Sequence, residues 1–186
     1  MEFKKIQLNG FKSFAEKTTF IIDKGLTGIV GPNGCGKSNI VESLRWCMGE
    51  TSAKSMRGSG MEDVIFSGTS NKPSKNIAEV SIAISNENKD GPIQYKNLDN
   101  IEVRRKIEKD KGSKFYINDK EVRAKDAQMF FADLSTGAHS PSIISQGRIG
   151  ALVTAKPTDR RAVLEEAAGI AGLHVRRHEA ELRLNA

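Results

Sequence analysis

Apolar and polar positions alternate through the middle of the chain with a period of two, which is typical of half-buried β-strands. The alternation is clearest over residues 77–84, where β-branched residues are separated by small or polar ones. Shorter segments of the same kind lie at 101–107 and 115–117, and the Asn-Asp-Lys sequence at 118–120 favours a tight turn. These segments predict a mostly antiparallel sheet in the middle of the chain.

The first 30 residues also favour strands. Phe3, Ile6 and Leu8 are apolar, and two β-branched runs follow at 18–22 and 26–30. A glycine-rich turn comes after the second run. A helix is then expected from about Lys37 to Met48, where Gly49 ends it. The order strand, turn, helix predicts a first β-turn-α unit.

The last third of the chain changes to helical patterning. Helices are expected at 125–134 and at 159–169, with Asp159 in the first turn of the second one, where it suits the helix dipole. Residues 171–186 are rich in Arg, Glu, Leu and Ala and carry an apolar stripe. They predict an amphipathic helix that the chain end cuts off.

Length and composition point to one globular domain or one large piece of a domain. The chain has 186 residues, of which 38% are apolar and 28% charged, so wholesale disorder is excluded. No apolar run approaches the roughly 18 residues that a membrane-spanning helix needs, and no secretory signal follows Met1. We therefore expect a cytoplasmic protein without a membrane partner.

Charge and cysteine content narrow the chemistry only slightly. The formal net charge of +6 allows a nucleic-acid partner, but it is equally compatible with ordinary solubilising charge. Cys35 and Cys47 do not form a Cys-x-x-Cys pair, and two thiols make neither a disulfide framework nor a four-ligand zinc site.

One motif carries specific chemistry. Residues 31–38, Gly-Pro-Asn-Gly-Cys-Gly-Lys-Ser, match the pattern Gly-x-x-x-x-Gly-Lys-[Ser/Thr] of nucleotide-binding phosphate loops. The glycines let backbone N–H groups converge on a phosphate at a helix N-terminus. Lys37 is then within reach of the β- and γ-phosphate oxygens, and the Ser38 hydroxyl can bind Mg²⁺. The motif predicts a site for ATP or another nucleoside triphosphate.

The sequence around this loop resembles the SMC chromosome-segregation ATPases, a branch of the ABC-type ATPases. Residues 31–40 are similar to the phosphate loop of that family, and 8–14 to its first strands. Met56-Arg57-Gly58 resembles its arginine loop, 142–147 its glutamine loop, and 160–172 the segment that leads into its coiled coil. The similarity covers nearly the whole chain, with 86–120 the least diagnostic part, and it points to bacterial SMC proteins.

The resemblance implies an α/β fold of the P-loop NTPase type. It implies an ABC-ATPase-like N-terminal lobe of an SMC head, with a mixed sheet, over residues 1–169, and the start of an antiparallel coiled coil over 170–186. The acidic strand end, the catalytic glutamate and the signature motif of such a head would come from a C-terminal lobe outside this chain.

The resemblance also implies the roles of individual residues. Lys37, Gln146 and Arg57 would be catalytic, and Ser38 and Gln146 would bind Mg²⁺. The nucleotide would contact Gly31, Pro32, Asn33, Gly34, Cys35, Gly36, Lys37, Ser38 and Asn39, together with Lys12, Ser13 and Asp63. From residue type alone, Gln146 is a polar loop residue, Arg57 one surface arginine among many, Lys12 a solvated lysine and Asp63 an edge aspartate.

Several other features are set aside. Residues 129–133 and 134–137 superficially resemble the acidic strand and the signature motif, but both precede Gln146, which is the wrong order for an ABC-type head.

His174 and His178 have a spacing that can share a metal ion, yet two arginines near them favour a solvated coil face. In the basic run from Arg104 onward, Arg104 and Lys106 would share one strand face with Glu102 and Glu108. That pattern favours a solvated face over contacts to DNA phosphates.

The expected partners are the C-terminal lobe of the same SMC polypeptide, a second head in a homodimer, a kleisin-type subunit and double-stranded DNA. The expected location is the cytoplasm, in association with the nucleoid. Four alternatives remain open: an SMC-like DNA-repair ATPase, a free-standing P-loop kinase, a P-loop GTPase, and a structural DNA-bridging module that keeps the fold without binding nucleotide. The GTPase is disfavoured because Asn71-Lys72-Pro73-Ser74 has serine where guanine recognition needs aspartate.

Overall fold

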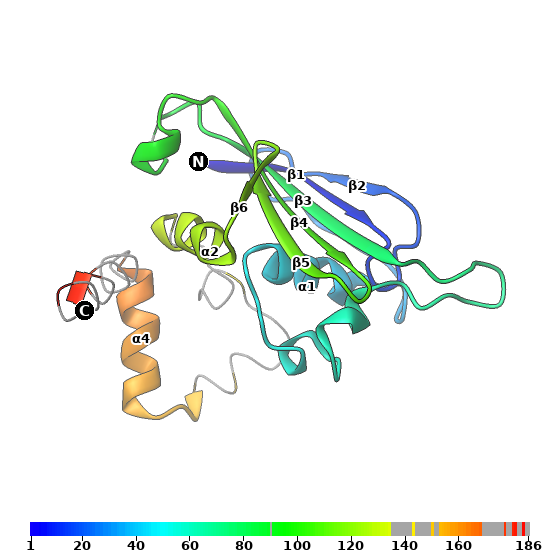
Figure 1. The fold of residues 1–186 in the computed structure, drawn as a ribbon. Coiled ribbons are helices and arrows are strands. Elements are labelled where there is room, and N and C mark those ends of the chain that lie inside the picture. The colour runs from blue at the N-terminus through cyan, green and yellow to red at the C-terminus, as the bar shows by residue number, and fades with distance from the viewer. Residues whose placement is uncertain are drawn as a thin grey trace.

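The computed structural model describes residues 1–89, 91–134 and 153–168, together with the single residues 143, 150, 177, 180, 181 and 184. Six strands form one sheet in the order β2-β1-β3-β4-β5-β6 (Figure 1). The strands are β1 Glu2–Asn9, β2 Thr18–Ile21, β3 Ile77–Ser85, β4 Asn100–Glu108, β5 Gly112–Ile117 and β6 Lys120–Val122. The helices are α1 Lys37–Cys47, α2 Ala124–Asp133 and α4 Pro157–Ala167, with short 3₁₀ turns η1 Lys54–Met56, η2 Met61–Val64 and η3 Ile93–Tyr95.

The antiparallel sheet predicted from the alternating pattern is confirmed. Every pair of neighbouring strands in this sheet is antiparallel, and strand ends differ from the predicted ones by only a few residues. The tight turn between β5 and β6 is also present. Asn118 and Asp119 there adopt left-handed backbone angles, with φ of 47° and 63°, which Asn and Asp tolerate better than most residues.

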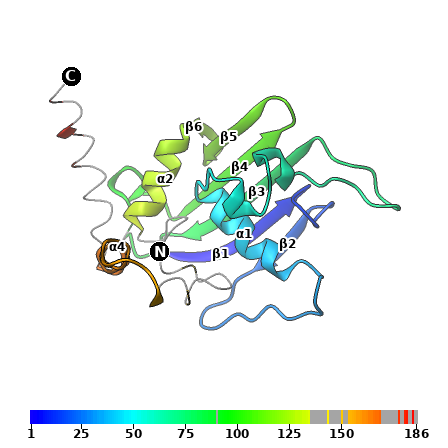
Figure 2. The same cartoon turned by 90° about the horizontal axis from the view of Figure 1, so that it is seen from below.

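Helices α1 and α2 cover one face of the sheet, as Figure 2 shows from below. Helix α1 packs on β3 and β4, and α2 packs on β5. The fully buried residues of this core include Leu8, Phe11, Trp46, Val80, Val103 and Phe131. The core therefore fixes α1, the helix that follows the phosphate loop, against the centre of the sheet.

Arg105, on β4, holds the C-terminal end of α1 in place. It lies on the inner face of β4 with only 3% of its surface exposed. Its guanidinium donates to the carbonyl oxygens of Trp46 and Glu50, both at 2.7 Å, and its Nε donates to Ser113 Oγ at 2.7 Å. The guanidinium also stacks on the rings of Trp46 and Phe115. Burial lowers the pKa of Arg105 to about 10, so it remains a cation at neutral pH.

The strand predicted at 26–30 is not formed in this structure. These residues pair with no strand of the sheet, so the parallel part of the expected mixed sheet is absent from the described residues. The cause is that no strand in the described residues lies beside this run. A β-branched run becomes a strand only where another strand satisfies its backbone groups. Leu26 is 100% exposed and Val30 93% exposed.

The predicted helices agree with the structure where it describes them. Residues 129–133 are helical, and Phe130 and Phe131 are buried in the core, which confirms that this segment is no acidic strand end. Helix α4 matches the expected helix at 159–169 within a few residues. His174, His178 and most of 171–186 lie outside the described residues. In the described parts of the chain, no helix is long and apolar enough to cross a membrane.

Candidate functional site

The phosphate loop is an exposed turn that leads directly into α1. Gly34 and Gly36 have φ angles of 83° and 97°, a region that only glycine enters without strain. Gly36 is the N-cap of α1, and no side chain caps the helix there. The first turn of α1 also contains no acidic residue. Its N–H groups and the positive end of the helix dipole are therefore available to an anion.

Lys37 lies over this loop. Its ammonium donates to the carbonyl oxygen of Gly31 at 2.5 Å and to that of Pro32 at 2.7 Å, and it lies 4.0 Å from Cys35 Sγ. The loop therefore folds around the lysine side chain and places its positive charge at the start of α1. An uncapped helix start beside a lysine fits a phosphate group.

Three segments meet beside the loop through a network of charged side chains. Glu42, on α1, accepts a hydrogen bond from Lys12 Nζ through Oε2 and forms an ion pair with Arg57 Nε through Oε1. Lys12 also donates to the carbonyl oxygen of Met56, the residue that precedes Arg57. The network ties the turn after β1 and the loop after η1 to the middle of α1.

A second set of contacts joins this network to the phosphate loop. Arg57 donates to Asn39 Oδ1 at 2.9 Å, and Asn39 Nδ2 donates to Ser13 Oγ at 2.8 Å. Ser13 in turn lies against Gly36, where a Cβ would come within 2.5 Å of Ser13 Oγ. The structure therefore brings Lys12, Ser13, Asn39 and Arg57 together around the start of α1, as expected for residues of one site.

Comparison with known proteins identifies the family. Residues 2–147 match the family model described as the RecF/RecN/SMC N terminal domain. The chain belongs to this family. It is 55% identical, over all 186 residues, to the chromosome partition protein Smc of Rhodopseudomonas palustris. It spans only 16% of the length of that relative.

Solved structures support the same assignment and confirm the α/β head fold. One, described as "Structural biochemistry of ATP-driven dimerization and DNA stimulated activation of SMC ATPases", has a TM-score of 0.76 and 33% identity, and the match covers 90% of this chain and 99% of that one. The Pyrococcus furiosus Smc head domain, solved with an extended coiled coil and bound to the C-terminal domain of ScpA, has a TM-score of 0.83 and 32% identity. That match covers 99% of this chain and 46% of the other.

Asp63 binds the backbone and side chain of the loop just before it. Its Oδ2 accepts hydrogen bonds from Ser59 N at 2.6 Å, Ser59 Oγ at 2.9 Å and Gly60 N at 2.9 Å. The Gly60 backbone N–H and the bonds from Ser59 lower the pKa of the Asp63 carboxyl. That carboxylate oxygen is thus already engaged within the loop that precedes η2, and contact with a base or ribose stays a prediction.

The remaining predicted residues are only partly placed. Ser38 is exposed at the start of α1, next to Lys37, and its binding of Mg²⁺ stays a prediction. Gln146 lies outside the described residues.

Glu42, on α1, was not predicted from the sequence as a residue of this site. The available signal was a carboxylate among the buried positions of α1, since Ile40, Ser43 and Trp46 are buried on the same helix.

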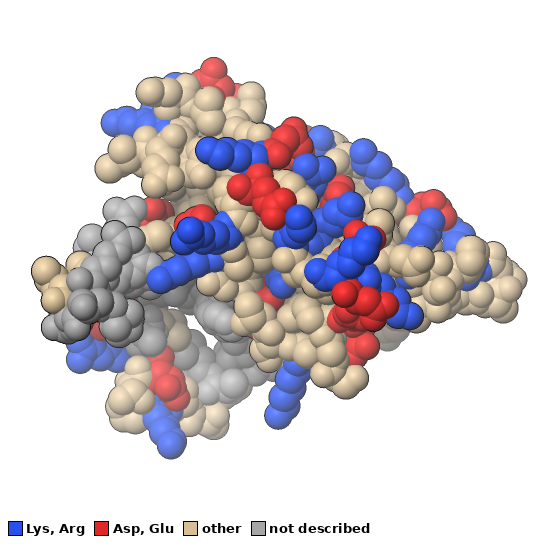
Figure 3. All heavy atoms as spheres, in the orientation of Figure 1, with Lys and Arg blue, Asp and Glu red and all other residues tan. Residues whose placement is uncertain are grey.

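The basic run on β4 faces outward in the way the sequence predicts. Arg104 and Lys106 share the outer face of the sheet with Glu102 and Glu108, whereas Arg105 points inward. Arg104 pairs with Asp119 at 2.7 Å. On the face shown in Figure 3, basic and acidic side chains are intermixed. The outer face of β4 is therefore a solvated surface of mixed charge.

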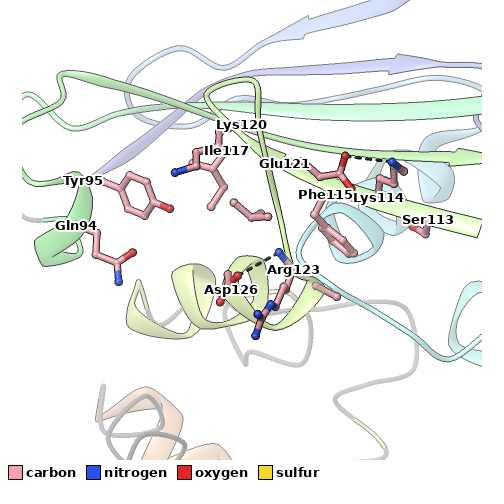
Figure 4. A pocket seen from close by; sticks show the side chains of 12 residues that line it. Gln94, Tyr95, Ser113, Lys114, Phe115, Ile117, Lys120, Glu121, Arg123 and Asp126 are labelled. Atoms are coloured by element: carbon pink, nitrogen blue, oxygen red, sulfur yellow. Dashed lines mark hydrogen bonds and ion pairs between the residues drawn. The ribbon is translucent and has the colours of Figure 1, made fainter.

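A pocket of about 850 Å³ lies between β5, β6, α2 and η3 (Figure 4). Tyr95 and Ile117 point into it, and the Lys114–Glu121 pair, at 3.1 Å, lies on its rim. None of its lining residues belongs to the phosphate loop. This pocket is thus separate from the candidate nucleotide site.

Proposed function

We propose that this chain is the ATP-binding N-terminal lobe of an SMC head, acting in chromosome condensation and segregation through ATP-dependent head engagement. The observation that carries the proposal is the uncapped, acid-free start of α1 with Lys37 folded over the loop. Family membership and 55% identity to a chromosome partition protein Smc support it.

In this proposal the backbone N–H groups after Gly36 bind the phosphates of ATP, and Lys37 moves its bonds from loop carbonyls to phosphate oxygens. The Ser38 hydroxyl and the Gln146 amide oxygen would hold Mg²⁺, which would supply positive charge to the phosphates. Gln146 also orients water, and Arg57 supplies positive charge to the developing phosphoryl group. The catalytic glutamate and the signature motif come from other parts of the complete head.

The proposed first partner is the C-terminal lobe of the same polypeptide. Leu26, Ile29 and Val30 are exposed apolar residues immediately before the phosphate loop. A β-branched run of this kind, next to a ligand site and without a sheet to join, fits a strand that pairs with the sheet of another lobe. Such pairing would bring the missing hydrolytic carboxylates next to Lys37.

The other proposed partners are a second head, a kleisin-type subunit and double-stranded DNA. One solved relative is described in terms of ATP-driven dimerization and DNA-stimulated activation. Another is bound to the C-terminal domain of ScpA. By the same similarity we place the protein in the cytoplasm, in association with the nucleoid. Nucleotide held between two heads would link ATP binding to dimerization.

The proposal is tested by co-expressing this lobe with the C-terminal lobe from the same gene and measuring ATP hydrolysis with and without duplex DNA. We expect turnover only when both lobes are present, and stimulation by DNA. Equal turnover by the 186-residue chain alone would instead favour a self-contained P-loop kinase or GTPase. Binding of DNA without any nucleotide binding would favour the structural bridging module.

Replacing Val30 with aspartate is expected to prevent the two lobes from co-purifying. A carboxylate in the pairing strand would be buried without a partner, which costs several kcal/mol, about 3 or more. The matched control is Ile93→Asp, because Ile93 is similarly exposed at 86% but belongs to η3. Co-purification of the Val30→Asp lobe at the level of the control would show that residues 26–30 do not form the interface.

A further inference from the structure

Glu42 is a buried carboxylate that the proposed ATP chemistry does not use directly. Its side chain is 11% exposed, yet both of its oxygens are occupied, one by Lys12 and the other by Arg57. Burying a carboxylate is unfavourable unless it is paired and hydrogen-bonded. The two cations meet this requirement, so Glu42 is held at a defined point on α1.

Arg57 is the member of this network that needs support. Its side chain is 58% exposed, and its backbone has a left-handed φ of 55° at the end of η1. An exposed arginine side chain has many accessible rotamers, so it samples many positions unless it is fixed. Glu42 binds its Nε while Asn39 binds its NH2 group. Two contacts from one face of α1 therefore fix the plane of the guanidinium.

Lys12 fixes Glu42 and the backbone beside Arg57 at the same time. Its ammonium donates to the Glu42 carboxylate and to the carbonyl oxygen of Met56. Through Asn39 and Ser13 the same network reaches Gly36 in the phosphate loop. The guanidinium of Arg57 is thus held at a fixed position relative to the start of α1, where the phosphates of ATP are proposed to bind.

We propose that Glu42 is a positioning residue that orients Arg57 for ATP hydrolysis. The inference rests on the proposed ATP site and on Arg57 acting there. Glu42 does not touch the nucleotide. It holds the guanidinium in one place before nucleotide arrives, so that little reorganisation is needed in the transition state. Lys12 acts indirectly, because it keeps Glu42 in place.

The test uses the full-length product of the gene and its DNA-stimulated ATP hydrolysis. In Glu42→Gln the shape is kept and the charge removed, and we expect kcat to fall about tenfold with KM changed less than about twofold. Arg57→Ala should lower kcat at least as much. In the Arg57→Ala background, Glu42→Gln should add less than about a twofold loss, because its effect passes through Arg57. Glu108→Gln, which breaks a surface pair with Lys111, is the matched control and should leave kcat unchanged.

An equal loss from Glu42→Gln with and without Arg57 would overturn the inference, since it would mean that Glu42 only supports the fold. Unchanged kcat in Glu42→Gln would also overturn it. If this variant does not fold, Glu42→Asp replaces it, with a smaller loss of kcat expected that again vanishes without Arg57. Activity that depends on Lys37 but not on Arg57 would reject this inference and leave the ATP site standing. Activity that does not depend on Lys37 would reject the proposed function itself.

Discussion

Replacing Lys37 with alanine is expected to lower ATP hydrolysis by the assembled two-lobe head by about a thousandfold, equivalent to about 4 kcal/mol of transition-state stabilisation. The reason is its position. The ammonium lies over the loop within 2.7 Å of two backbone carbonyls, at a helix start with no other cap. Without it, the charge that develops on the phosphates has only the backbone N–H groups and Mg²⁺ as partners.

The measurement is steady-state phosphate release together with nucleotide affinity from a fluorescent ATP analogue. Lys17→Ala, which removes an exposed lysine outside the loop, should leave both quantities unchanged. Retention of more than about a tenth of the kcat in Lys37→Ala would mean that Lys37 does not contact the reacting phosphates. The contacts seen here would then serve only to shape the loop.

Sequence patterns predicted the antiparallel strands because their information is local. A half-buried strand alternates along its own length, so β3 and β4 are visible without knowledge of their neighbours. The segment 26–30 carries the same β-branched signal but forms no strand in the described chain. Its pairing depends on a partner strand, and the composition of a segment does not reveal whether that partner is present.

Some residues of the candidate site were predicted from the sequence and others were not, for a similar reason. The phosphate loop was found because its glycines, Lys37 and Ser38 are contiguous in sequence. The family resemblance added Lys12, Ser13 and Arg57, and the structure places all three near α1. Glu42 was missed because its importance comes from two cations that lie 30 and 15 residues away in sequence. Pairing across such separations is set by the fold and leaves no local pattern.

Arg105 shows that the sequence also does not reveal which residues stabilise the fold through distant contacts. Within the basic run the sequence shows three adjacent cations, and the strand period tells only that the middle one faces away from the other two. The structure shows that this residue is buried and satisfies three acceptors at 2.7 Å. A single inward-facing arginine thus joins the end of α1 to β4 and β5.

Replacing Arg105 with methionine is therefore expected to lower the free energy of unfolding by about 3 to 5 kcal/mol. Methionine fills much of the volume, but it leaves the Trp46 and Glu50 carbonyls buried without that donor. Arg105→Lys should recover little of the loss, because an ammonium lacks the planar fork and the stacking on Trp46 and Phe115. The measurement is urea unfolding of this chain followed by the fluorescence of Trp46, its single tryptophan.

Arg104→Met is the matched control on the outer face of the same strand. Its partner Asp119 is 85% exposed, and exposed ion pairs of this kind contribute about 1 kcal/mol or less. The difference between the two neighbouring arginines separates burial from charge, because both substitutions remove one cation from β4. Equal destabilisation by the two substitutions would show that Arg105 does not anchor α1. The position of the phosphate loop would then depend on the apolar core around Trp46 alone.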